Sequence, residues 1–195
     1  MEPFLDLGRT SSCTRVSIIV IAVLPSLIRT LWPALVGALA IVAASTGNGA
    51  WTRRSAIAWM MGSWGARLAV QGFYTRAVRA AASPGDDEAD AGGIGKALML
   101  VASAIVCSAP AWLAAFNRAP ELSRLELAAC AVWFIGFAGE TTADRQRLRF
   151  GAAPVNQGLA CRTGLWRYSR HADRVFTALV WIAFATFGIV AVWAA

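Results

Sequence analysis

Apolar residues gather in five long stretches along the chain of 195 residues, and polar segments separate them. The stretches cover residues 16–44, 56–74, 97–116, 125–143 and 175–195. A helix needs about 20 predominantly apolar residues to cross the hydrocarbon core of a bilayer. We therefore predict an all-α fold, a polytopic transmembrane bundle of about five helices that forms a single transmembrane domain over residues 1–195.

The first stretch is too long for one straight span, and it contains Pro25, Arg29 and Pro33. Divided into two helices, it would leave about 13 residues for each, which is too few to cross a bilayer. Because proline can kink a helix, one kinked helix is the better prediction.

The amino-acid composition favours a membrane protein. Hydrophobic residues make up 57% of the chain and charged residues only 15%, whereas about a quarter of the residues in soluble domains are charged. The net charge of +7 could indicate a nucleic-acid partner, but the basic residues flank the apolar stretches and form no continuous basic stripe. We therefore expect contact with membrane lipid and no nucleic-acid binding.

The distribution of arginine predicts an orientation, since basic residues gather on the cytoplasmic side of a membrane. With five helices and a cytoplasmic N-terminus, the poorer side holds only Arg53, Arg54, Arg118 and Arg124. The cytoplasmic side then holds an acidic, glycine-rich loop at residues 81–95 and a longer loop at residues 144–174 with seven arginines. A long loop in a small domain is usually functional.

The chain has a single histidine, so we expect no metal site.

Two stripes of polar residues also point to this side. At spacings of three and four residues, one stripe comprises Trp64, Arg67, Gln71 and Tyr74, and the other comprises Trp133, Gly136, Glu140, Asp144 and Arg147. Such spacing places each set on one face of a helix. Because an ionisable group inside a membrane usually faces a partner or a cavity, the stripes predict a polar cavity between helices. Alternatively, Arg67 and Glu140 form an ion pair that only holds the bundle together.

Residues 164–171, with the sequence GLWRYSRH, carry several hydrogen-bond donors. Arg167 and Arg170 suit phosphate oxygens. The rings of Trp166 and Tyr168 could stack on a planar ligand, or they could belong to the aromatic belt of the membrane interface.

Together these segments resemble bacterial membrane proteins grouped with the steroid 5-alpha-reductase C-terminal domain, which are related to isoprenylcysteine methyltransferases. That family has a helix ending in E-x-x-A-D-x-Q-x-x-x-F, then a loop and G-L-W-R-Y-S-R-H-P-N-Y-F-G-E. The matching residues are Glu140, Ala143, Asp144, Gln146 and Phe150 in the first element, and Gly164 to His171 in the second. Upstream, the chain resembles the family's helix with W-G-x-R-L and a later R, and the matching residues are Trp64, Gly65, Arg67, Leu68 and Arg76. The likeness covers residues 30–185, and its main motif region is 133–181.

This resemblance implies a helix bundle in the bacterial inner membrane with a nucleotide cofactor at its cytoplasmic mouth. In the steroid reductases the cofactor is NADPH, which gives hydride to an enone double bond. The implied function is an NAD(P)H-dependent membrane reductase, an oxidoreductase of lipid metabolism that acts on a steroid or another lipid-like enone. Carried over by position, the cofactor-binding residues would be Arg67, Glu140, Asp144, Arg149, Arg167, Tyr168, Arg170 and His171. The resemblance assigns no catalytic residue.

Departures from the family pattern keep two alternatives open. After His171 the family reads P-N-Y-F-G-E, whereas here Asp173 and Thr177 stand where it has Asn and Glu. Relatives are also expected to continue past the position of Ala195. A divergent, C-terminally shortened and non-catalytic membrane protein, acting as one subunit of a homo- or hetero-oligomer, would fit these departures. The related methyltransferases use a similar R-H-P element, so an S-adenosylmethionine-dependent membrane methyltransferase is the other alternative.

Overall fold

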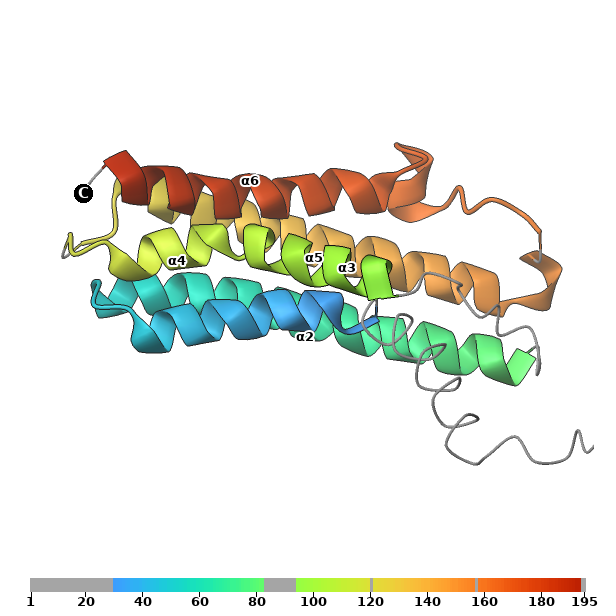
Figure 1. Ribbon diagram of the computed structural model, residues 1–195. Helices are drawn as coiled ribbons and strands as arrows, with labels where there is room; N and C mark the ends of the chain where they lie inside the picture. Colours follow the sequence, from blue (N-terminus) through green and yellow to red (C-terminus); the bar gives the residue numbers. More distant parts are fainter. Residues whose placement is uncertain (1–29, 83–93, 120, 157, 194–195) are drawn as a thin grey trace, which may run out of the picture. The chain divides into compact units, whose positions relative to one another are not determined.

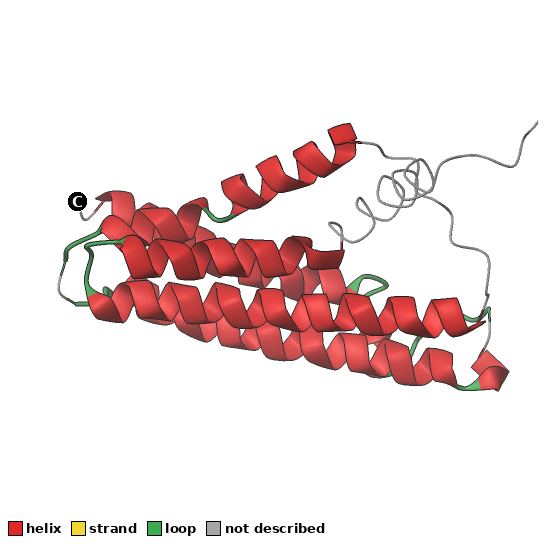
Figure 2. Ribbon diagram, turned by 60° about the horizontal axis from the view of Figure 1, so that its bottom comes forward, coloured by secondary structure: helices red, strands yellow, loops and turns green. Residues whose placement is uncertain are grey.

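The computed structural model describes residues 30–82, 94–119, 121–156 and 158–193. Within these ranges every regular element is a helix and no strand is formed (Figure 2), which confirms the predicted all-α fold. The α-helices are Thr30–Thr46, α2 (Trp51–Ala82), α3 (Ile94–Cys107), α4 (Ala109–Phe116), α5 (Arg124–Ala152) and α6 (Ala172–Trp193) (Figure 1). Two 3-10 helices, η1 (Pro154–Asn156) and η2 (Gly164–Arg167), lie between α5 and α6. The beginning of the stretch 16–44 and most of the acidic loop at 81–95 lie outside the described residues.

Helices α2 and α5 are longer than the apolar stretches from which they were predicted. Helix α5 continues to Ala152, so the prediction of a loop is wrong for residues 144–152. Hydropathy reports where a helix is apolar, but Arg, Gln and Leu favour a helix whether or not lipid surrounds it. The helix ends where Ala153 adopts an extended conformation before Pro154, because a residue that precedes proline disfavours the helical region.

Two of the described helical segments are long and apolar enough to cross a membrane, Ala97–Phe116 and Ala172–Trp193. The first runs through α3 and α4, which are separated at Ser108. Pro110 lies in the first turn of α4, where its missing N–H costs nothing because that donor has no intrahelical partner. These two candidate spans are consistent with a membrane protein. That the chain crosses the membrane five times stays a prediction.

The chain divides into two compact units. Unit 1 contains, among the described residues, 30–36, 65–82 and 94–107, and unit 2 contains 37–64 and 108–193 apart from the two undescribed positions. Within unit 1, Trp32 Nε1 donates to Ser103 Oγ at 2.9 Å, which joins the first helix to α3. The motif region at residues 133–181 belongs entirely to unit 2.

The core of unit 2 is built around the antiparallel pair α5 and α6 (Figure 1). Two glycines of α5 allow a close approach: a methyl group added at Gly136 would lie 3.0 Å from Phe176 O, and one at Gly139 would collide with the Phe176 ring. On the other side of the core, Trp64 of α2 makes edge-to-face contacts with Trp181 at 5.4 Å and with Phe184 at 6.0 Å. The glycine contacts let α5 pack closely on α6, and the Trp64 contacts pack this part of α2 on α6.

Candidate functional site

A buried carboxylate, Glu140, lies in the middle of unit 2 with only 4% of its surface exposed. Trp64 Nε1 donates to its Oε2 at 3.1 Å, and the Thr177 hydroxyl lies 2.8 Å from its Oε1. Burying a charged group is costly unless donors replace its water. Helices α2 and α6 each supply such a donor, so the orientation of Glu140 is set by three helices.

On the N-terminal side of Glu140 in α5, the predicted polar stripe does not open into a cavity beside Gly136. There the space is filled by Phe176 and Val180 of α6. One turn closer to the N-terminal end of α5, Trp133 is buried and stacks on Phe137 with ring centroids 4.9 Å apart. Its indole N–H is shielded from solvent and has no hydrogen-bond partner in the part of the chain that the structure describes.

We call residues 144–174, which follow Glu140 in the chain, the arginine-rich end. They comprise the end of α5, η1, η2 and the start of α6. Helix η2 is attached to α5 by two hydrogen bonds, from Leu165 N to Gln146 Oε1 at 2.9 Å and from Trp166 Nε1 to Ala143 O at 2.9 Å. Gly164 has a φ of +60°, and a side chain there would collide with Gln146. The motif residues Gln146, Gly164 and Trp166 therefore hold this segment in place.

Most cationic side chains of the arginine-rich end are exposed. Those predicted to bind a cofactor are Arg149, Arg167, Arg170 and His171, and all four are exposed. Within the described residues, none of these four side chains forms a hydrogen bond or an ion pair. Tyr168 is 87% exposed. Exposed guanidinium groups beside an exposed aromatic ring suit an anionic ligand that also has a planar ring.

Arg147 differs from the other arginines at this end. Its Nη1 lies 4.0 Å from Asp173 Oδ2 of α6, and its Cζ lies 5.8 Å from the centre of the Trp166 ring of η2. The sequence placed Arg147 in a polar stripe but not among the cofactor-binding residues. Asp173 Oδ1 is shielded from solvent and, among the described residues, has no hydrogen-bond partner.

The structure brings seven of the eight predicted site residues together within unit 2. Glu140 is buried, Asp144 is half-buried one turn later on α5, and the remaining five are exposed. Arg67 is half-buried in unit 1, where its Nη1 lies 3.4 Å from Gln71 Oε1. Its place in the same site stays a prediction.

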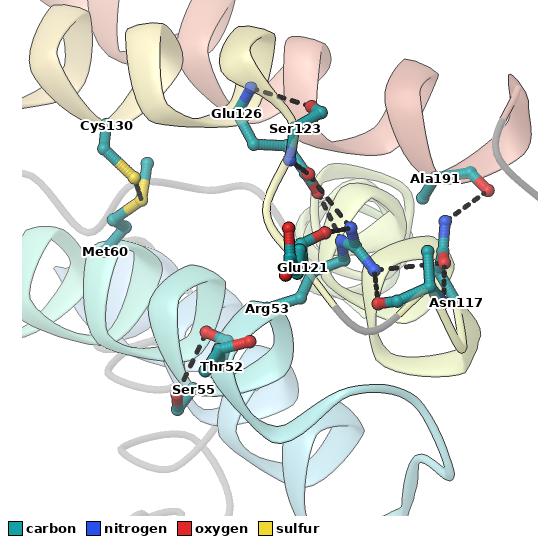
Figure 3. A network of polar contacts seen from close by, with 11 residues as sticks. Thr52, Arg53, Ser55, Met60, Asn117, Glu121, Ser123, Glu126, Cys130 and Ala191 are labelled. Carbon is teal, nitrogen blue, oxygen red and sulfur yellow. Dashed lines mark hydrogen bonds and ion pairs between the residues drawn. The ribbon is translucent and has the colours of Figure 1, made fainter.

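The sequence did not predict that Arg53 would be fully paired, with more hydrogen bonds than any other arginine that the structure describes. Arg53 is 1% exposed, and all five of its N–H donors are directed at acceptors (Figure 3). Nε and Nη2 donate to the two carboxylate oxygens of Glu126. The remaining donors reach Asn117 Oδ1 at 3.1 Å, Ala119 O at 2.7 Å and Glu121 O at 2.7 Å. We call these residues, with Ser123, the Arg53 cluster.

Ser123 and Glu126 of the Arg53 cluster also begin α5. Glu126 N donates to Ser123 Oγ at 3.2 Å, and Ser123 N donates to Glu126 Oε2 at 2.7 Å, which is a reciprocal capping box. The sequence S-R-L-E at residues 123–126 carries this signal. Nothing in the sequence shows that the same carboxylate binds Arg53, because that partner lies 73 residues away.

The Arg53 cluster lies at the opposite end of unit 2 from the arginine-rich end. Asn117 Nδ2 donates to Ala191 O near the C-terminal end of α6 at 3.1 Å, whereas η2 lies near the start of that helix. A hollow of about 490 Å³ opens beside the cluster. Its lining comprises Asn48, Gly49, Ala50, Trp51, Thr52 and Arg118, and it includes none of the predicted site residues.

Comparison with known proteins gives one family. Residues 97–195, just over half of the chain, match the family described as "Protein of unknown function (DUF1295)". The matched region includes both candidate spans, Glu140 and the whole arginine-rich end. Searches of curated proteins and of solved structures give no significant match.

Proposed function

Because this chain belongs to the DUF1295 family, which is associated with steroid 5-alpha-reductase-like proteins, we propose that it is an NAD(P)H-dependent membrane reductase of a lipid-like substrate. One observation carries the proposal. The arginine-rich end holds exposed guanidinium groups and an exposed tyrosine on a segment that is attached to α5, close in the chain to the buried Glu140.

The chemistry of this end favours a dinucleotide over S-adenosylmethionine. A guanidinium group is planar and permanently charged, and its fork of donors matches phosphate oxygens. NADPH and NADH carry a pyrophosphate, whereas S-adenosylmethionine has no phosphate and bears a positive sulfonium. An excess of exposed arginines attracts the first class of ligand and repels the sulfonium of the second. Tyr168 offers a ring face on which a base can stack.

The length of α5 supports a site where a water-soluble cofactor meets a lipid. Its 29 residues correspond to about 44 Å, longer than a hydrocarbon core of roughly 30 Å. A crossing helix of this length would extend beyond the hydrocarbon, so we infer that the end of α5 lies in the aqueous layer and its middle among apolar helices. In such a site the protein contributes mainly by positioning the nicotinamide against the substrate and by excluding water.

The test is a binding titration on the purified, detergent-solubilised protein with NADPH and S-adenosylmethionine in parallel. We expect saturable NADPH binding that is weakened in Arg170→Ala and unchanged in Arg118→Ala, which removes an exposed arginine at the other end of unit 2. Consumption of NADPH on addition of an enone lipid would then establish reduction. Binding of S-adenosylmethionine alone would overturn the proposal in favour of a methyltransferase.

One observation favours a second candidate, a non-catalytic protein of the same fold. Thr177 stands where the resembling family has a glutamate, and its hydroxyl lies 2.8 Å from Glu140 Oε1. The resembling family therefore has a second carboxylate close to the one matched by Glu140, and this chain has a neutral hydroxyl in its place. A protein that binds neither ligand, or that binds NADPH and never oxidises it with any enone, would support this candidate.

A further inference from the structure

We infer that Arg147, held between Trp166 and Asp173, is the main phosphate-binding arginine of the arginine-rich end. This inference rests on the proposed function for the identity of the nucleotide, but the phosphate site itself can be tested separately. Trp166 and Asp173 would act as positioning residues, since they fix the guanidinium group rather than contact the phosphate.

Contacts from two other elements restrict the Arg147 side chain. Helix α5 carries Arg147, η2 supplies the ring of Trp166 at 5.8 Å, and the first turn of α6 supplies Asp173 at 4.0 Å. Trp166 is itself fixed, because its indole N–H donates to Ala143 O at 2.9 Å. The other exposed arginines of this end have no such contacts among the described residues.

A restricted guanidinium group binds phosphate better than a freely moving one. Ordering a long side chain on binding costs conformational entropy, about 0.5–1.5 kcal/mol for each side chain that becomes immobilised. For Arg147 part of this cost is met when the protein folds. A fork of donors that is already oriented can also form two parallel hydrogen bonds with one phosphate.

The contacts of Arg147 also leave most of its N–H donors without a protein acceptor among the described residues. Its side chain is 65% exposed, and the 4.0 Å separation from Asp173 is longer than a direct hydrogen bond. An exposed pair of this kind adds little stability, typically 0–1 kcal/mol. Arg53, in contrast, directs all five donors at protein acceptors. Arg147 is therefore both oriented and available to a ligand.

The experiment compares three variants of the full-length, detergent-solubilised protein: Arg147→Ala, Arg147→Lys and the control Arg145→Ala. Arg145 is exposed two residues away on the same helix, so its loss changes the net charge equally. Inorganic pyrophosphate and NADPH are titrated separately by calorimetry. We expect Arg147→Ala to weaken both by at least about tenfold and Arg145→Ala by less than about threefold. Lysine should not restore binding, because it lacks the planar fork.

The positioning role is tested with Trp166→Leu, alone and combined with Arg147→Ala. If Trp166 acts through Arg147, its loss weakens pyrophosphate binding in the otherwise unchanged protein and has no further effect in Arg147→Ala. A purely structural role would give the same loss in both backgrounds.

The outcomes separate this inference from the proposed function. Pyrophosphate binding that depends on Arg147, without NADPH binding, would support the inference and overturn the reductase. NADPH binding that Arg147→Ala and Arg145→Ala weaken equally would overturn the inference and leave the reductase standing. A protein that binds neither ligand would overturn both.

Discussion

Arg53 and Arg147 lie at opposite ends of unit 2, and the same side chain is used there in two different ways. Arg53 is 1% exposed and all five of its donors meet protein acceptors, whereas Arg147 is 65% exposed and has one distant carboxylate. Around Arg53 the neighbours are a carboxylate, an amide oxygen and backbone carbonyls from the connection between α4 and α5. Around Arg147 the neighbours are the ring of Trp166 and the distant carboxylate of Asp173.

The difference shows how to distinguish a structural arginine from one that is available to a ligand. A buried guanidinium group is tolerated only when its charge is paired and its donors are satisfied. An exposed guanidinium group needs no partner, since water solvates it. Substitutions in the Arg53 cluster should therefore change stability, and substitutions at the arginine-rich end should change binding. The predictions below test this division, from the largest expected effect to the smallest.

Removing the carboxylate of the Arg53 cluster should cause the largest loss of stability. Glu126→Ala leaves Arg53 buried without its counter-charge, and it also removes half of the capping box of α5. We expect the free energy of unfolding to fall by about 3–5 kcal/mol, measured by thermal unfolding in detergent. Arg124→Ala, an exposed arginine in the same turn, is the control and should leave stability unchanged. Equal effects of the two substitutions would contradict the role of the cluster.

Widening the contact between α5 and α6 should have the next largest effect. In Gly139→Ala the new methyl group would collide with the Phe176 ring, which should cost about 1–3 kcal/mol of stability. Gly151→Ala is the matched substitution on the same helix, where nothing lies within 4 Å of the added methyl group. It should be neutral or stabilise slightly, because alanine favours a helix more than glycine does. The same unfolding measurement would reject the close packing if both variants behaved alike.

Removing one donor from Glu140 should have a smaller effect. Thr177→Val keeps the shape of the side chain but removes the hydroxyl that lies 2.8 Å from Glu140 Oε1. Because Trp64 still donates to the other oxygen, we expect a loss of about 1 kcal/mol. Thr177→Ser keeps the hydroxyl and should lose less. A threonine that only fills space would give the reverse order, since serine also loses a methyl group.

Substitutions of exposed arginines should change stability least. Arg167→Ala should alter the free energy of unfolding by less than about 0.5 kcal/mol, yet it should weaken NADPH binding. Because such contacts are screened by salt, the affinity of the unchanged protein should fall as the salt concentration rises, and less steeply in the variant. Unfolding and binding are measured on the same preparation. A marked loss of stability would show that Arg167 belongs to the structure instead.

Much of the helical architecture could be predicted from the sequence. The stretches 97–116 and 175–195 became the two candidate spans because hydropathy alone identifies an apolar helix. The end of α5 could not be found in this way, because residues 144–152 are polar and still helical. Helix formation depends on the backbone and the side-chain preference, which hydropathy does not measure.

The site was less predictable than the fold. Motif matching identified Glu140 and the segment after Gly164, and the structure joins that segment to α5 through Gln146. Motif matching could not tell which arginines are buried and paired and which are exposed. Whether an arginine is buried with five acceptors or exposed beside one carboxylate depends on residues far away in the sequence. From the sequence, Arg53 was therefore interpreted as a basic residue that flanks a membrane span, and Arg147 could not be distinguished from the other arginines of residues 144–174.

The distance along the chain between Arg53 and Glu126 has a consequence for biosynthesis. Because 73 residues separate them, and a ribosome adds about 5–20 residues per second, Arg53 waits roughly 4–15 s for its counter-charge. Until Glu126 has been made, the guanidinium group lacks its counter-charge, and burying it would be costly. We therefore expect this end of unit 2 to be completed late, after the start of α5 has been synthesised.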